Sequence, residues 1–221
     1  MDERVALAGE LYKKSIFAGD GEALAAADRL LDAAEAELLI ARGRILHGRF
    51  LAERQENPGV QARESSSRGE SLLFERALEL FRSLGDESGE VEALFWIGCF
   101  HQVVRGDNDA AVPVLLQARE LAVKVGDKVT HSDILRHLGI AEHSAGRLDE
   151  GRALLEESTE IRRALGLHAG AAANLVGLIY VARAQGRDHD ARALAIEGRA
   201  LASSAGATTI LTQLDQAAAE L

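Results

Sequence analysis

Two interleaved series of glycines recur along most of this chain at a nearly constant interval. The first series is spaced by 41, 40 and 40 residues and comprises Gly85, Gly126, Gly166 and Gly206. The second lies between these positions at intervals of 40 and comprises Gly106, Gly146 and Gly186. Glycine adopts positive φ freely, and a residue of that conformation ends many α-helices. Two series with one period therefore predict a tandem array of helical hairpins.

The segments between the glycines predict two helices for each repeat, with the residue after the glycine available as an N-cap. We expect first helices, here called A helices, and second helices, called B helices. The A helices are expected at 87–104, 128–144 and 168–184, and the B helices at 108–124, 148–164 and 188–204. A last helix over 207–220 lies where the next A helix would fall, so we expect 207–221 to cap the array.

The N-terminal part follows the same plan less closely. Residues 70–86 match a B helix, and 35–54 match its A helix. Between them, 55–69 is a polar insertion with proline, glycine and serines, which favours a mobile loop. Residues 3–17 and 22–34 are expected to form one further helical pair. The sequence thus predicts an all-α domain over 1–221 with about nine or ten helices, divergent over 1–69 and well matched over 70–206.

Composition agrees with this prediction and narrows the function. Hydrophobic residues make up 47% of the chain and aromatic residues 4%, which favours a helical core of leucine, alanine, isoleucine and valine. The formal net charge of −10 argues against a general nucleic-acid or anionic-membrane partner, because both require a basic face. No apolar run is long enough to span a membrane, and the N-terminus does not resemble a signal peptide. We expect a cytoplasmic protein.

The repeat resembles the tetratricopeptide repeat family in the order of its small and large residues. The closest correspondence comprises Leu138-Gly139, Gly146-Arg147, Gly151, Leu155 and Ser158. The preceding repeat follows the same order with one extra residue between Gly98 and Gly106. The 40-residue period with Gly-Asp between units is similar to a longer-linker subclass. The resemblance is good over 70–221 and weaker over 1–69. It implies a right-handed superhelix whose A helices line the inner surface.

In that family the inner stripe of each A helix contacts partner peptides, and the resemblance places matching residues here. The first repeat contributes Glu92, Phe95, Cys99 and Gln102, and the second contributes Asp133, Arg136, Ile140 and His143. The third contributes Ala173, Val176, Tyr180 and Arg183. Apolar anchors beside a few charges suit recognition of a peptide or helix. The alternative is that the apolar helix 91–104 is buried by the N-terminal helices or by a second subunit.

Other motifs point to structure more than to chemistry. His131, His137 and His143 are six residues apart and are rotated by about 240° on a helix, so they cannot share one metal ion. Arg105-Gly106-Asp107 belongs to the glycine series, which favours a turn over an adhesion motif. Cys99 has no partner for a disulfide and no signature of a nucleophile. We expect no metal, no cofactor and no phosphate-binding loop.

The leading hypothesis is a non-catalytic interaction module or adaptor that binds a peptide or helix of a partner protein. A regulatory sensor that responds to a peptide or small ligand is a second hypothesis. An enzyme with a site assembled from Asp133, Arg136, His143 and Arg183 is a third. Self-association through helix 207–220 or helix 91–104, as a homodimer or scaffold, is a fourth.

Overall fold

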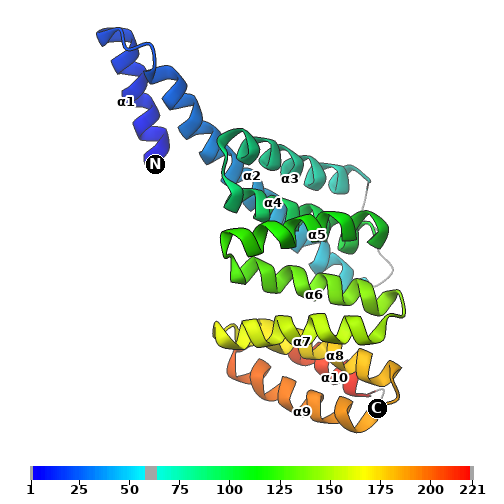
Figure 1. Cartoon of the computed structure of the whole chain (residues 1–221). Coiled ribbons are helices and arrows are strands. Elements are labelled where there is room, and N and C mark those ends of the chain that lie inside the picture. The colour runs from blue at the N-terminus through cyan, green and yellow to red at the C-terminus, as the bar shows by residue number, and fades with distance from the viewer. Residues whose placement is uncertain (1, 58–63, 220–221) are drawn as a thin grey trace. The chain divides into compact units, whose positions relative to one another are not determined.

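The computed structural model of the chain describes residues 2–57 and 64–219, with backbone alone for 64–68. Every regular element in these residues is helical, so the prediction of an all-α fold is confirmed (Figure 1). The chain divides into two compact units, residues 1–121 and 122–221. Each unit is built from antiparallel helical hairpins.

The elements follow one another in chain order with short connections. The first unit contains α1 (Glu3–Ala18), α2 (Ala23–Glu56), α3 (Glu64–Leu84), α4 (Glu87–Cys99), the π-helical segment η1 (Phe100–Val104) and most of α5 (Asn108–Val125). The second contains α6 (Lys128–Ser144), α7 (Leu148–Ala164), α8 (His168–Ala184), α9 (Asp188–Ser204) and α10 (Thr208–Ala219). None of the described helices combines the length and the apolar character that crossing a membrane requires.

All seven glycines of the two predicted series have positive φ, between 64° and 78°. Each lies one or two residues beyond a helix end, so the predicted helix boundaries after residue 84 are confirmed to within one or two residues. Gly146 shows the local mechanism: its N–H and that of Arg147 donate to the carbonyl oxygens of His143 and Glu142, which lie in the last turn of α6.

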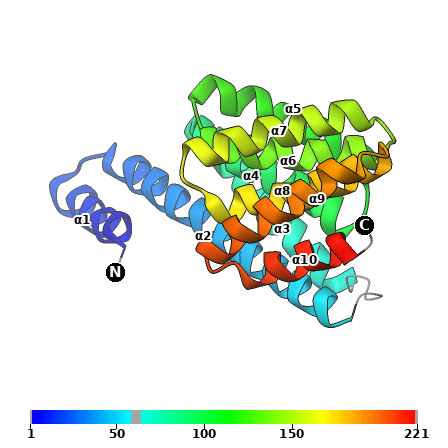
Figure 2. The same ribbon diagram turned by 90° about the horizontal axis from the view of Figure 1, so that it is seen from below.

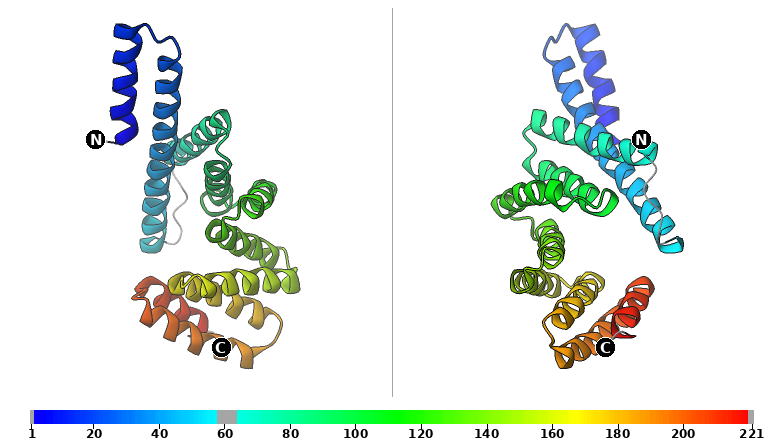
Figure 3. Two further views of the ribbon diagram at one scale, coloured as in Figure 1. Left: turned by 60° about the vertical axis from the view of Figure 1, so that its left-hand side comes forward. Right: turned by 90° about the vertical axis from the view of Figure 1, so that its right-hand side faces the viewer.

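The prediction of separate helices over 22–34 and 35–54 is wrong, because both segments belong to the single helix α2. Between Ala23 and Arg42 the sequence contains neither glycine nor proline, and no residue there ends a helix. The first half of α2 pairs with α1, and the second half packs against α3 and α4 (Figure 3). One continuous helix therefore joins two helical pairs.

The polar insertion is shorter than the predicted loop over 55–69. Residues 55 and 56 end α2, and 64–69 already belong to α3. Asn57 follows the end of α2, and the remaining residues of the predicted loop, 58–63, lie outside the described residues. Residues 64–68 contain glutamate, serine and arginine but neither glycine nor proline, so composition alone overestimated the loop.

The extra residue between Gly98 and Gly106 is accommodated by η1. Here the N–H of Arg105 donates to the carbonyl oxygen of Phe100, five residues earlier, over 3.1 Å. A π-type turn holds one more residue than an α-turn, so η1 absorbs the insertion and the following glycine still ends the helix.

In the first unit, α2, α3 and α4 share one hydrophobic core. Ile40, Phe74, Phe81 and Ile97 are buried there, together with small residues of the same helices. Close packing depends on Gly43, where a Cβ atom would lie 2.3 Å from the Phe74 ring. Absence of a side chain at this position thus permits α2 and α3 to cross at short range.

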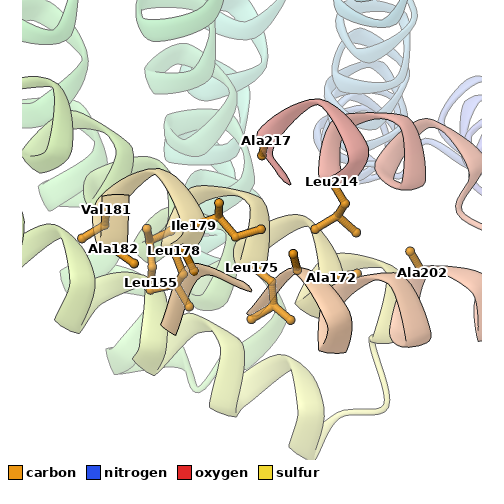
Figure 4. Packing of buried hydrophobic residues seen from close by; sticks show 12 residues of the cluster. Leu155, Ala172, Leu175, Leu178, Ile179, Val181, Ala182, Ala202, Leu214 and Ala217 are labelled. Carbon is orange, nitrogen blue, oxygen red and sulfur yellow. The ribbon is translucent and has the colours of Figure 1, made fainter. Parts of the chain in front are cut away.

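In the second unit, α6 pairs with α7 and α8 pairs with α9, while α7 also packs against α8 and α10 packs against both α8 and α9 (Figure 2). Figure 4 shows Leu155 of α7 among Leu175, Leu178 and Ile179 of α8. The helices α6 and α7 approach where a Cβ on Gly139 would lie 2.8 Å from the Leu155 side chain and 3.1 Å from a backbone oxygen. This close approach fixes how α6 packs against α7.

Candidate interaction face

Neighbouring helices α6 and α8 each carry one stripe that the rest of the second unit does not fully cover. The stripe residues on α6 are three, four and three residues apart with Asp133 as the first, which places them on one side of the helix. The same spacing recurs on α8. We use the name α6–α8 face for Arg136, Ile140, His143, Val176, Tyr180 and Arg183, all of which are half-buried.

Apolar and cationic groups alternate along this face. Val176 and Tyr180 pack partly against the core of the second unit, which holds their positions. The Arg183 guanidinium lies over the Tyr180 ring, 5.8 Å from its centroid. A cation above an aromatic ring covers one face of the ring, so the ring edge is still available for an apolar contact beside the positive charge. Ala173, the first residue of the α8 stripe, is also half-buried.

The stripe predicted on α4 is different, because its two anchors are not available to a ligand. Phe95 is 6% exposed and Cys99 is 1% exposed. The prediction that Phe95 and Cys99 line a binding surface is therefore wrong for this structure, and the alternative of a buried helix 91–104 describes them. Glu92 and Gln102 remain half-buried. They make intramolecular contacts, Glu92 with Arg44 at 3.4 Å and Gln102 with Asn108 at 3.1 Å.

Both α3 and the second half of α2 pack against α4. The Trp96 ring stacks on Phe74 with 5.7 Å between centroids, and His47 meets it edge-on at 5.5 Å. The Arg44 guanidinium lies 5.6 Å from the centroid of the same ring. His47 is itself buried and its Nδ1 lies 2.8 Å from a carboxylate oxygen of Glu70. These residues build the first unit and leave little of α4 for a partner.

Asp133, predicted on the inner stripe, instead joins a buried polar network centred on Arg162 of α7. The Arg162 guanidinium forms an ion pair with Asp133 and donates to Asn174 Oδ1 over 2.8 Å and to the Gly170 carbonyl over 2.7 Å. Asn174 in turn donates to Ser158 Oγ over 2.8 Å. The network ties α6, α7 and α8 together and fixes the angle at which α6 and α8 present their stripes.

Burial sets the protonation behaviour of this pair. It lowers the pKa of the Arg162 guanidinium, while the neighbouring Asp133 charge opposes that change. It also raises the pKa of the Asp133 carboxyl above 3.8, against the opposing charges of Arg162 and Arg136, although 38% of the side chain is exposed. Arginine retains its proton under all ordinary conditions, so the network keeps a positive centre.

Sequence reasoning missed Arg162, Asn174 and Ser158 as members of one network. Their spacing within the repeat marks them as core positions, where a polar residue needs a buried partner. The sequence thus indicated that these polar residues are buried. It did not show which residues they bind, because the partners lie on three different helices. Among the described residues, no group of three or more His, Cys, Asp or Glu side chains is arranged to hold a metal ion. His131, His137 and His143 are all half-buried on α6.

Comparisons with known proteins agree with the fold. No family model matches the chain, and no curated protein sequence matches it. The crystal structure of BtubC (BKLC) from P. vanneervenii is similar, with a TM-score of 0.56 over 92% of this chain and 90% of that chain. The sequence identity is 12%, so the likeness concerns the fold alone. The chain therefore has an all-α, repeat-like fold that is also found in BtubC.

Proposed function

We propose that this protein is an interaction module of the tetratricopeptide type, which holds a peptide or helix of a partner protein against the α6–α8 face. The observation that carries the proposal is the combination of Ile140, Val176 and Tyr180 with Arg136 and Arg183 on two neighbouring helices that both pack against α7. Apolar anchors give affinity when they are buried by a ligand, and flanking charges select its orientation and sequence.

The charges on the face specify the chemistry of the partner. Arg136 and Arg183 place two positive charges on this face, within a chain whose net charge is −10. A peptide with acidic residues beside leucine, phenylalanine or a similar side chain complements both features. Arginine suits this task because its planar guanidinium binds carboxylates through two parallel hydrogen bonds.

The proposal is of a non-enzymatic adaptor acting in the cytoplasm. Support comes from the role of Asp133, which belonged to the one acid–base set that the sequence suggested. Its carboxylate forms an ion pair with Arg162 and contributes to the packing of three helices. A group held in this way serves the architecture, and Arg136, His143 and Arg183 without it contain no carboxylate base.

A displayed library of random peptides is the probe that tests the proposal. It is panned against the protein and counter-selected against a variant with Ile140→Asp and Tyr180→Ala. We expect enriched peptides that combine acidic with apolar residues. Their addition to isotope-labelled protein should shift amide resonances in α6 and α8. Peptides that bind the variant equally well, or shifts confined to other helices, would refute the proposal.

A further inference from the structure

Along α2, large apolar residues recur every seven positions and remain exposed. They are Leu24, Leu31, Leu38 and Ile45, and between 42% and 56% of each is accessible. The positions three residues after each are small: Ala27, Ala34, Ala41 and Gly48. A heptad of this kind is the pattern by which one helix packs along another. The helices α3 and α4 occupy a different side of α2, at Ala36, Ile40, Gly43 and His47.

The helix α1 extends the same exposed surface. It runs antiparallel to the first half of α2 (Figures 2 and 3). Val5, Tyr12 and Ile16 are between 42% and 56% exposed. Each directly follows a half-buried residue, and these residues are Arg4, Leu11 and Ser15.

The exposed residues of the two helices lie on one side of this hairpin. On α2, Leu24 directly follows the buried Ala23, and Leu31 directly follows the half-buried Leu30. Each residue of an α-helix is rotated by about 100° from the residue before it. In two antiparallel helices, the residues that directly follow the contact positions therefore face the same side of the pair. An apolar surface built from two helices and continued by the second half of α2 marks an interaction site.

Charged residues follow the apolar stripe with the same interval of seven. Asp28 and Glu35 lie in the first half of α2, and Arg42 and Arg49 lie in the second half. All four are exposed, and among the described residues Glu35 forms one long ion pair, with Arg76 at 3.9 Å. If a second α2 lies antiparallel with its midpoint opposite that of the first, Asp28 lies within two residues, or about 3 Å along the helix, of the level of Arg49, and Glu35 lies equally near Arg42. All four pairs of the two-fold arrangement then have opposite charges.

We propose that the protein forms a homodimer in which α2 pairs antiparallel with α2 of a second copy, around a two-fold axis between Leu38 and Ala41. The second half of each α2 covers the α1–α2 surface of the other copy. A two-fold interface uses the same residues on both subunits, so a self-complementary pattern favours a second copy over an unrelated protein. This surface belongs to the first unit, and the proposal is independent of the α6–α8 face.

A parallel pairing of the two helices gains no such match. The flanking positions on the other side of the stripe are Glu37 and Arg44, and both are already engaged within the chain. Arg4 binds Glu37 at 2.5 Å, and Arg44 contacts Glu92 at 3.4 Å. The exposed charges of the two copies form pairs of opposite sign only in the antiparallel arrangement.

Sedimentation velocity over a concentration series tests the dimer. The native protein should sediment with twice the 23.6 kDa mass of one chain and dissociate on dilution. A variant with Leu31→Glu and Leu38→Glu should sediment as a monomer at every concentration. Because both residues are exposed, its helical circular dichroism and its unfolding midpoint should stay within a few degrees of the native values. A monomeric native protein overturns the proposal.

A charge exchange tests the antiparallel pairing itself. One variant carries Asp28→Arg and Glu35→Arg, and the other carries Arg42→Glu and Arg49→Glu. Each alone should be monomeric, because four like-charged pairs would oppose association. An equimolar mixture should restore the dimer mass, since every pair then has opposite charges. Variants that dimerise alone, or a mixture that stays monomeric, would show that this register is wrong, even if the native protein is a dimer.

Discussion

Arg162 on α7 donates a hydrogen bond to the Asn174 side chain on α8, over 2.8 Å, in the interior of the second unit. The same guanidinium forms an ion pair with Asp133 of α6. A single buried cation thus links three consecutive helices whose residues lie 12 to 29 positions from it in the sequence. The orientation of the α6–α8 face depends on this link.

Removal of the cation should be costly. Arg162→Met leaves Asn174, Asp133 and the Gly170 carbonyl without their donor, and we expect a loss of about 3 kcal/mol in the free energy of unfolding. Arg163→Met is the matched control on the same helix. Arg163 pairs with Glu197 at the surface, where such pairs contribute less than about 1 kcal/mol. Chemical denaturation measures both, and equal losses would contradict a structural role for the network.

Replacement of two glycines of α2 by alanine should change the stability of the protein in opposite directions. At Gly43 a Cβ would lie 2.3 Å from Phe74, so Gly43→Ala should destabilise the protein by about 1–3 kcal/mol. At Gly48 nothing lies within 4 Å, so Gly48→Ala should stabilise the helix by roughly 0.5–1 kcal/mol. Thermal unfolding of the two variants compares them directly. Stabilisation by both would mean that α2 and α3 do not cross at Gly43.

The glycine series shows how far the sequence could predict this fold. Each glycine that the period selects ends a helix, because positive φ is a local requirement that one residue type satisfies. The same logic failed before residue 57, where no glycine separates the two halves of α2 and helix continues. Local signals therefore located the hairpins in the regular repeats but overestimated the number of breaks elsewhere.

The candidate face was only partly predictable, for a physical reason. The resemblance to tetratricopeptide repeats selected the positions on α6 and α8, and these residues are half-buried on one side of each helix. On α4 the same resemblance selected Phe95 and Cys99, which are buried. Spacing within one helix does not show which other helices cover it, and α4 packs mainly against α3 and to a lesser extent against α2.

Burial of Cys99 can be checked with a thiol reagent. The side chain is 1% exposed, so reaction with a water-soluble disulfide should be at least about a hundredfold slower in the native protein than in denaturant. The absorbance of the released thiolate follows the reaction, and Cys99 is the only thiol in the chain. Rapid reaction without denaturant would mean that Cys99 is exposed on α4, as the sequence analysis predicted.

Two aspartates should titrate on opposite sides of the ordinary value of 3.8. Hydrogen bonds from Arg4 lower the pKa of Asp2, at the start of α1, to about 2, whereas burial raises the pKa of Asp133. Asp2 thus stabilises the fold above pH 3.8 and loses this effect as the pH falls toward 2. Asp133 contributes its full stabilisation below pH 3.8 and loses it as the pH rises through its raised pKa. Carboxyl carbon resonances measure both pKa values; a lowered pKa for Asp133 would refute the assigned effect of burial.

The affinity of one selected peptide for variants of the α6–α8 face tests the proposed function most directly. Tyr180→Ala removes the aromatic anchor, and we expect the dissociation constant to rise about thirtyfold, which corresponds to a loss of about 2 kcal/mol. Ile140→Asp should weaken binding similarly, while Ile196→Asp, at a 70% exposed position on α9, should leave it unchanged. Fluorescence anisotropy with a labelled peptide measures all three. Unchanged affinity in a folded Tyr180→Ala variant would contradict the proposal that this face binds the partner.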